Sequence, residues 1–307
     1  MRSQPVIGID LDTAVVAALF GPDAPLSPRA LGGLLDASGV DFVVLGGDVL
    51  DPESAVESAF DASVAAAVLS AHTDGVGFVV PADPRVHHPY NLSRRLASLD
   101  HVSGGRVGWL VGARSLAEDS VESRVAASVD AVVVARKLWE SWPAESIVAD
   151  PERGVFVESE RITFIDHEGV FSVSGPLNVP EPPQLKPPVL WRPHSESELE
   201  TALGVADVVI VPARHTATDA PALVLEEAQW TGSWSAIVGV PHHAAGIVVR
   251  IRGTSDLDTA LVAASTELVR VAAAPFRNRI GLPVAETVLD GYRRSAFPSL
   301  DRSECKG

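Results

Sequence analysis

The chain has 307 residues, of which 46% are hydrophobic and 21% charged, so it can bury a large core as one α/β domain or two smaller ones. Its formal net charge of −16 disfavours binding to nucleic acid or to an anionic membrane surface. The single cysteine, Cys305, excludes a disulfide framework and a cysteine-based metal site. The N-terminal region lacks a basic start followed by an apolar run, so no signal peptide is expected. The apolar stretches are too short to span a bilayer, and we therefore expect a cytoplasmic protein.

Short apolar runs alternate along the chain with longer segments of helical period. The runs are rich in valine and nearly continuous, which is typical of parallel strands buried on both faces. They predict strands at residues 6–11, 42–45, 76–80, 107–111, 188–191 and 207–211.

Helix starts lie between these strands. The Ser27-Pro28 and Asp51-Pro52 pairs each place an N-cap residue before a proline at the first helical position. A further helix is expected to begin at Pro89. This alternation of strands and helices requires right-handed crossovers and predicts either a doubly wound sheet or a barrel.

One stretch departs from the alternation. Segments 161–164 and 170–173 flank the sequence DHEG at 166–169, which predicts a β-hairpin. A proline-rich connector follows it. We interpret residues of about 151–187 as an excursion between the fourth and fifth strands of a single domain covering 1–307, because regular β/α units resume afterwards.

The strand count near the C-terminus stays open. Apolar runs at 235–240 and 247–251 predict two more strands, which brings the total to eight. The connection at 241–246 is too short to hold a crossover helix. Either these two strands pair antiparallel, or the last part of the barrel is abbreviated.

Four segments in register carry a resemblance to a known family. Residues 88–109 have the sequence HPYNLSRRLASLDHVSGGRVGW, and LWESW at 138–142, IDHEGVF at 165–171 and GPLN at 175–178 follow in order. Together they resemble the bacterial luciferase-like flavin monooxygenases, in the branch around nitrilotriacetate monooxygenase component A. The chain looks like a divergent, shortened member, and the resemblance fades after about Val211.

The resemblance implies a TIM-like (β/α)8 barrel that binds reduced FMN, supplied by a separate flavin reductase, at the carboxyl ends of its strands. Oxygen adds to the flavin, and the peroxide oxidises a small organic substrate. Some luciferase-like relatives use the deazaflavin F420 instead. The cofactor carries the chemistry, while the protein binds it and excludes water. A homodimer is the expected assembly.

Three positions near the flavin of the family can be compared along the first half of the chain. Asp48 matches an acidic residue after the second strand, although a plain loop residue that caps the next helix fits equally well. The Thr-Ser pair of the family after the fourth strand aligns with Arg114 and Ser115, and we take Ser115 as the cofactor-binding candidate. Arg124 matches the arginine of an Arg-Tyr pair, but Val125 replaces the tyrosine.

The loop after the fifth strand departs further from the family. Relatives carry a Gln-Ala-Gly-x-Ser-x-x-Gly loop that cradles the flavin phosphate, whereas residues 191–198 have the sequence WRPHSESE. Only Ser195 survives, and Pro193 and Glu198 replace the glycines that let the backbone approach a phosphate. Ser195 and Glu198 instead predict a capping box, whose negative charge repels a phosphate.

Two functions therefore remain open. The chain is either a flavin-dependent monooxygenase with a remodelled cofactor loop, or a paralogue that has lost flavin chemistry and serves as a binding or assembly partner. The hydroxyl-rich end of the third strand in the family is replaced by VVPA at 79–82, which favours the second function. The sequence assigns no catalytic residue. The adjacent histidine pairs at 87–88 and 242–243 do not point at one ion, so no metal site is predicted.

Overall fold

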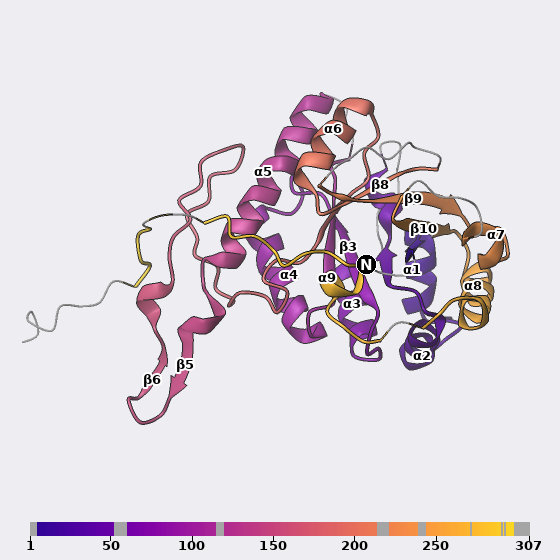
Figure 1. Ribbon diagram of the computed structural model, residues 1–307, viewed down its shortest axis with the longest axis horizontal. Helices are drawn as coiled ribbons and strands as arrows, with labels where there is room; N and C mark the ends of the chain where they lie inside the picture. The colour runs from indigo at the N-terminus through magenta and orange to yellow at the C-terminus, as the bar shows by residue number, and fades with distance from the viewer. Residues whose placement is uncertain are drawn as a thin grey trace, which may run out of the picture.

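The computed structural model describes residues 5–51, 60–114, 120–213, 221–238, 244–270, 272–289, 291 and 293–297. Its centre is a closed barrel of parallel strands, which confirms the predicted barrel (Figure 1). The barrel strands are β1 (Val6–Leu11), β2 (Phe42–Leu45), β3 (Gly77–Ala82), β4 (Val107–Val111), β7 (Val189–Trp191), β8 (Val208–Pro212), β9 (Leu223–Gln229) and β10 (Gly246–Ile251).

Helices surround this barrel, and two of them begin where the sequence predicts. The Ser27 hydroxyl oxygen accepts a hydrogen bond from the Ala30 backbone N–H at 3.2 Å, and another helix starts at Pro89. The start predicted at Asp51-Pro52 lies outside the described residues from Pro52 onwards. The longer helices are α1 (Thr13–Phe20), α2 (Pro28–Ser38), α3 (Ala62–Ser70), α4 (Pro89–Ser103), α5 (Val121–Glu140), α6 (Glu196–Val205) and α8 (Thr254–Glu267). None of the described helices combines the length and hydropathy needed to cross a bilayer.

The inside of the barrel is a packed apolar core. Its side chains come from alternate positions of the strands and include Phe42, Val79, Leu110, Ile210 and Val248, all of them buried. A second, larger cluster packs between the outer face of the barrel and the helices. Because the lumen is filled, a ligand site has to lie at the rim of the barrel, as in other TIM-like barrels.

A single aromatic side chain closes the amino-terminal end of the barrel. Phe276 belongs to the short helix α9 (Phe276–Arg279), and its ring centroid lies 5.4 Å from that of Phe42. A Cβ atom placed on Gly77 or Gly108 would lie 2.6 or 2.7 Å from atoms of the Phe276 ring. These two glycines therefore make the space into which the C-terminal segment inserts Phe276.

The excursion between β4 and β7 is present, but its hairpin lies earlier than predicted. The two-stranded sheet consists of β5 (Ile147–Asp150) and β6 (Val155–Val157), flanked by the 3₁₀ helices η2 (Ala144–Ser146) and η3 (Ser159–Arg161). Segments 161–164 and 170–173 do not form the predicted hairpin, and a single bridge joins His167 to Val173. The reason is that this turn docks on α5, where the Asp130 carboxylate accepts a hydrogen bond from the Phe171 N–H at 2.8 Å.

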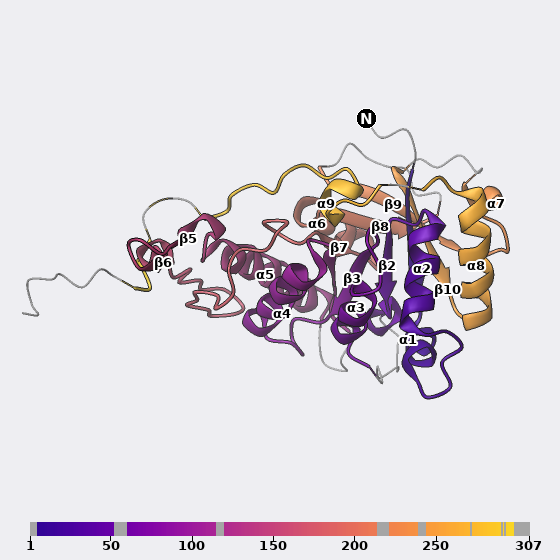
Figure 2. The same cartoon turned by 90° about the horizontal axis from the view of Figure 1, so that it is seen from below.

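The excursion and the C-terminal segment lie side by side at one end of the molecule (Figures 1 and 2). Arg294 forms an ion pair with Asp166, with 3.0 Å between Nη2 and Oδ1, and its guanidinium lies 3.9 Å from the centre of the Phe164 ring. Ser295 also bridges to Thr163 in antiparallel fashion.

The prediction for residues 235–240 is wrong. Residues 234–238 form the short helix α7 (Trp234–Val238), and 239–240 lie outside the described residues. The seventh barrel strand is instead β9, which was missed because its sequence, LVLEEAQ, is rich in helix-forming residues. β10 pairs with β1 and β9 in parallel, so the antiparallel alternative is also wrong, and the barrel closes completely.

Candidate functional site

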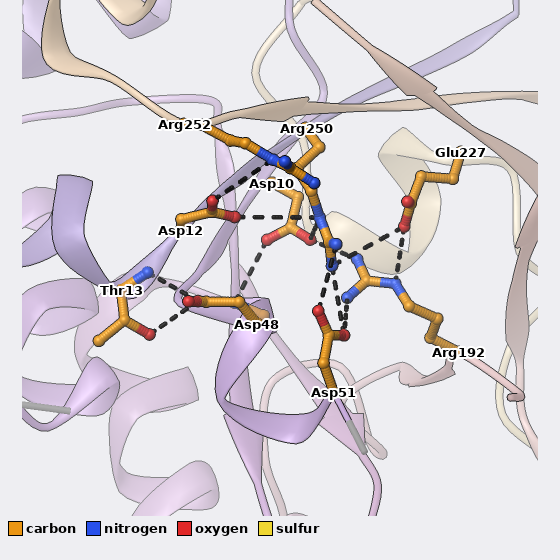
Figure 3. Close-up of polar contacts among 10 residues, drawn as sticks. Asp10, Asp12, Thr13, Asp48, Asp51, Arg192, Glu227, Arg250 and Arg252 are labelled. Carbon is orange, nitrogen blue, oxygen red and sulfur yellow. Dashed lines mark hydrogen bonds and ion pairs between the residues drawn. The ribbon is translucent and has the colours of Figure 1, made fainter. Parts of the chain in front are cut away.

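Four charged side chains form the last inward layer of the barrel at the carboxyl ends of its strands. They are Asp10 from β1, Arg192 immediately after β7, Glu227 from β9 and Arg250 from β10 (Figure 3). Asp10 is fully buried, and the side chains of both arginines are only 10% exposed. This is the position at which TIM-like barrels place their active sites.

The strand period explains how these charges reach the mouth. Side chains alternate along a strand, so Asp10 follows Val6 and Gly8 on the inward face of β1. Arg250 follows Val248 in the same way on β10. The register of the two strands pairs Asp10 directly with Arg250.

The two arginines join carboxylates from three parts of the chain. Arg192 contacts Asp10 through Nη2, and its Nε lies 3.0 Å from Glu227 Oε2. Arg250 Nε lies 3.6 Å from Asp10 Oδ2, and its Nη1 lies 3.2 Å from Asp51 Oδ2. Asp51 follows the short helix η1 (Gly47–Leu50), so the network ties the β2 connection to β1, β7 and β10.

Burial makes this network interdependent. Burial lowers the pKa of Arg250, but the carboxylates of Asp10, Glu227 and Asp51 together raise it above its ordinary value. Arg250 therefore stays charged, and each buried charge depends on its partners. The layer seals the apolar lumen beneath it and occupies the centre of the mouth.

Asp12 lies just above this layer and has a perturbed pKa. Desolvation by burial raises the pKa of Asp12 to about 6, with help from the nearby charge of Asp48 and against the opposing charge of Arg250. Among the described residues, Asp12 Oδ1 has no hydrogen-bond partner, and its contact with Arg250 Nε is 3.9 Å long. Asp12 therefore takes up a proton near neutral pH more readily than an ordinary aspartate does.

We expect Asp12→Asn to gain stability relative to the wild type as the pH rises from about 4 to 7. The folded pKa is higher than the unfolded one, so the contribution of Asp12 is present at low pH and is lost as the pH rises through about 6. Urea unfolding at several pH values measures this difference. Asp23→Asn, at an exposed loop position, is the control and should show a flat difference. A flat difference for Asp12→Asn as well would refute the raised pKa.

Asp48 has a structural partner. Its Oδ1 accepts hydrogen bonds from the backbone N–H of Thr13 at 2.6 Å and from the Thr13 hydroxyl at 2.7 Å. Asp48 thus caps the start of α1, the helix after the preceding strand. Ser115, another cofactor-binding candidate, lies outside the described residues.

Arg124 and the loop after β7 lie together, but they leave little space. Arg124 is half-buried in the first turn of α5 and lines, with Arg192 and Glu198, a cavity of about 30 Å³. That volume holds about two water molecules, whereas ligand pockets span roughly 300–1,000 Å³. The structure brings Arg124 to this loop, whereas Asp48 faces α1.

Ser195 caps α6 as the sequence predicts. Its hydroxyl oxygen accepts a hydrogen bond from the Glu198 backbone N–H at 3.2 Å. The Glu198 carboxylate accepts from the His194 backbone N–H at 2.8 Å and from Trp191 Nε1 at 2.8 Å. The Glu198 carboxylate therefore takes the His194 N–H donor and places a negative charge at this helix start, where it would repel a phosphate.

The residues present do not fit a flavin at the centre of the mouth. Arg192 and Arg250 fill the space above the lumen, and the cavity beside Arg124 is far too small for the cofactor. Within the described ranges, no three His, Cys, Asp or Glu side chains are arranged to hold a metal ion.

Sequence reasoning missed the network itself. The signal was available, because Asp10 and Arg250 are each the next-to-last residue of an otherwise apolar strand and lie at an inward position. An ionisable residue at the end of a barrel strand faces the mouth. What the sequence alone does not provide is the order of strands around the barrel, which decides that these two charges are neighbours.

Sequence comparisons identify the family of this chain and several similar proteins. A model of the luciferase-like monooxygenase family matches residues 26–229, well over half of the chain. The chain is 37% identical over 167 residues to nitrilotriacetate monooxygenase component A of Aminobacter aminovorans, a match that covers 51% of this chain and 37% of that protein. It is 29% identical over 303 residues to a pristinamycin IIA synthase subunit of Streptomyces pristinaespiralis, covering 93% of this chain and 97% of that protein.

A solved structure has the same fold as this chain. EDTA monooxygenase from Chelativorans sp. BNC1 superposes with a TM-score of 0.69 at 18% identity, covering 91% of this chain and 98% of that one. The chain thus spans little more than a third of its nitrilotriacetate relative, but nearly the whole of the pristinamycin synthase protein.

Proposed function

This chain belongs to the luciferase-like monooxygenase family, and on that premise we propose that it is one component of a flavin-dependent monooxygenase whose flavin is bound by a partner chain. The assembled enzyme oxidises a small organic molecule. The observation that carries this proposal is the barrel mouth, in which Asp10, Arg192 and Arg250 occupy the space above the lumen.

The energetics of the network support this assignment. A flavin ring could enter the centre of the mouth only if the ion pairs of Arg192 and Arg250 separated. Breaking a buried ion pair costs about 3–5 kcal/mol. The network is therefore a stable closure of the barrel rather than a preformed cofactor pocket.

The loop after β7, which corresponds to the phosphate loop of the family, supports the same proposal. Glu198 accepts from the N–H group of His194, and Pro193 occupies a position where relatives carry glycine. A phosphate at this loop would meet the Glu198 carboxylate, which repels it.

A relative of nearly the same length supports the proposal that this chain acts together with a partner chain. The pristinamycin synthase protein, which this chain matches over almost its whole length, is named as a subunit of its enzyme. By analogy, we infer that this chain also acts in an assembly with a second, flavin-binding chain. Its barrel then serves as a rigid binding and assembly partner that helps to exclude water from the reaction in the other chain.

A second candidate is a monooxygenase that binds reduced FMN or F420 itself. It is favoured by the half-buried Arg124, which matches the arginine of the family, and by a hollow of about 270 Å³ at the rim. In that case a separate flavin reductase supplies the reduced FMN, and the site requires a rearrangement of Arg192 and Arg250.

A flavin titration separates the two candidates. The purified chain is titrated with FMN, with reduced FMN under anaerobic conditions and with F420, and fluorescence is followed. We expect no saturable binding at micromolar concentrations, with nitrilotriacetate monooxygenase component A as the positive control. Saturable micromolar binding that Arg124→Ala weakens would overturn the proposal that a partner chain holds the flavin. The mass of the purified protein in solution separately tests the homodimer predicted from the sequence.

A further inference from the structure

A hollow of about 270 Å³ lies at the rim of the barrel, between η1 and the connection from β3 to α4. One side of it is apolar and is lined by Leu45, Val49, Leu50 and Pro81. Its volume is near the lower end of the range of about 300–1,000 Å³ for ligand pockets. The hollow therefore has room for a small organic molecule.

The opposite side is charged, and its two carboxylates already have partners. Asp83 is buried and accepts hydrogen bonds from the Arg85 side chain at 3.1 and 3.3 Å, as well as from two backbone N–H groups. Asp61 accepts from the N–H and the hydroxyl of Ser63 and pairs with Arg95 at 3.0 Å. Neither carboxylate is open to a cationic ligand.

The Asp83–Arg85 pair positions a third arginine. Asp83 Oδ2 accepts from the Arg114 backbone N–H at 3.0 Å, and Arg85 donates to the Arg114 carbonyl oxygen. The Arg114 backbone is thus held at both of its polar groups. Its side chain lines the hollow, and within the described ranges no ion pair or hydrogen bond engages its guanidinium.

Arg95 adds a second donor on the same side. Its Nη1 pairs with Asp61, but its buried Nε has no hydrogen-bond partner in the described part of the chain. Burial and the charge of Arg95 lower the pKa of His87, which also lines the hollow. His87 is therefore neutral at pH 7 and offers a hydrogen bond without adding charge.

We infer that this hollow binds a small organic anion, a carboxylate with an apolar body, whose carboxylate meets Arg114 and Arg95 while its body covers Leu45 and Val49. An arginine fork matches a carboxylate geometrically and binds it through charge-assisted hydrogen bonds. Among the described residues no carboxylate pairs with the Arg114 guanidinium, so this arginine can meet an anion even in a chain of formal charge −16. The inference rests on the proposed function, in which a partner chain holds the flavin and this hollow is left for the small molecule.

Calorimetric titrations with three eight-carbon probes test the inference. Octanoate, octanol and octylamine share an apolar body and differ in the charge of the head group. We expect saturable octanoate binding at pH 7, with octanol about tenfold weaker or worse and octylamine not bound, because each lost charge-assisted hydrogen bond is worth about 1.5–3 kcal/mol. Equal binding of the three probes, or no octanoate binding at millimolar concentration, would overturn the inference.

A variant pair locates the site. Arg114→Met keeps the apolar stem and removes the guanidinium, so it should weaken octanoate binding about tenfold or more and leave octanol binding unchanged. Arg29→Met, at an exposed position on α2, is the matched control and should bind octanoate like the wild type. If Arg114→Met binds octanoate as tightly as Arg29→Met does, the assignment of the site is wrong.

Discussion

Replacing Arg250 with methionine is expected to lower the free energy of unfolding by about 3–5 kcal/mol, because the change removes a buried positive charge that Asp10, Asp51 and Glu227 share. Asp10 is fully buried and would then have Arg192 as its remaining ion-pair partner, and Asp51 would lose its contact of 3.2 Å. Methionine preserves most of the apolar stem, so the loss reports on charge rather than on packing. Urea unfolding at pH 7 measures the effect.

Arg252→Met is the matched control. Arg252 lies two residues further along, its side chain is 66% exposed, and its ion pair with Asp12 is 3.8 Å long. A pair of this kind contributes about 0–1 kcal/mol, so the control should lose little. Equal losses for the two variants would contradict the buried network. A double variant, Asp10→Asn with Arg250→Met, should lose less than the sum of the two single variants, because the partners act as a unit.

Replacing Phe276 with alanine is expected to cost about 3–5 kcal/mol of unfolding free energy, the usual range for a large buried aromatic side chain. Phe276 is fully buried and plugs the amino-terminal end of the barrel, where Gly77 and Gly108 leave room for its ring. The truncated side chain leaves a cavity that backbone strands cannot collapse to fill. Denaturant unfolding at pH 7 again measures the loss.

Phe297→Ala serves as the control for this second effect. Its side chain is 54% exposed, and surface substitutions of this kind stay within about 0.5 kcal/mol. If Phe276→Ala and Phe297→Ala gave similar unfolding midpoints, the C-terminal segment would not be a structural part of the barrel. A larger loss of unfolding free energy for Phe276→Ala, as expected, would show that α9 is needed to close the amino-terminal end of the barrel.

Because both of its ends are closed, the barrel is a rigid scaffold. Phe276 closes the amino-terminal end with apolar packing, and the Asp10–Arg192–Arg250 network closes the carboxyl end with paired charges. Such a barrel suits a binding and assembly role, and it leaves the rim beside β2 and β3 as the place where a small ligand fits.

Local patterns were sufficient for most of the elements. The valine-rich runs predicted β1, β2 and β4 with their observed bounds, because a strand buried on both faces must be apolar throughout. The Ser27 and Ser195 caps also followed from neighbouring residues, since a cap satisfies N–H groups only a few positions away.

Only the tertiary structure decided the features that depend on distant partners. β9 carries Glu226 and Glu227 within a strand, and Glu227 is tolerated there because Arg192 reaches it from β7. The predicted hairpin at 161–173 gave way to docking on Asp130, and Asp48 caps α1, which begins 35 residues earlier in the chain. The sequence by itself determined the barrel and its periodicity. Which charges meet at the mouth, and which aromatic ring closes the far end, depends on strand order and chain closure, and these are properties of contacts far apart in the sequence.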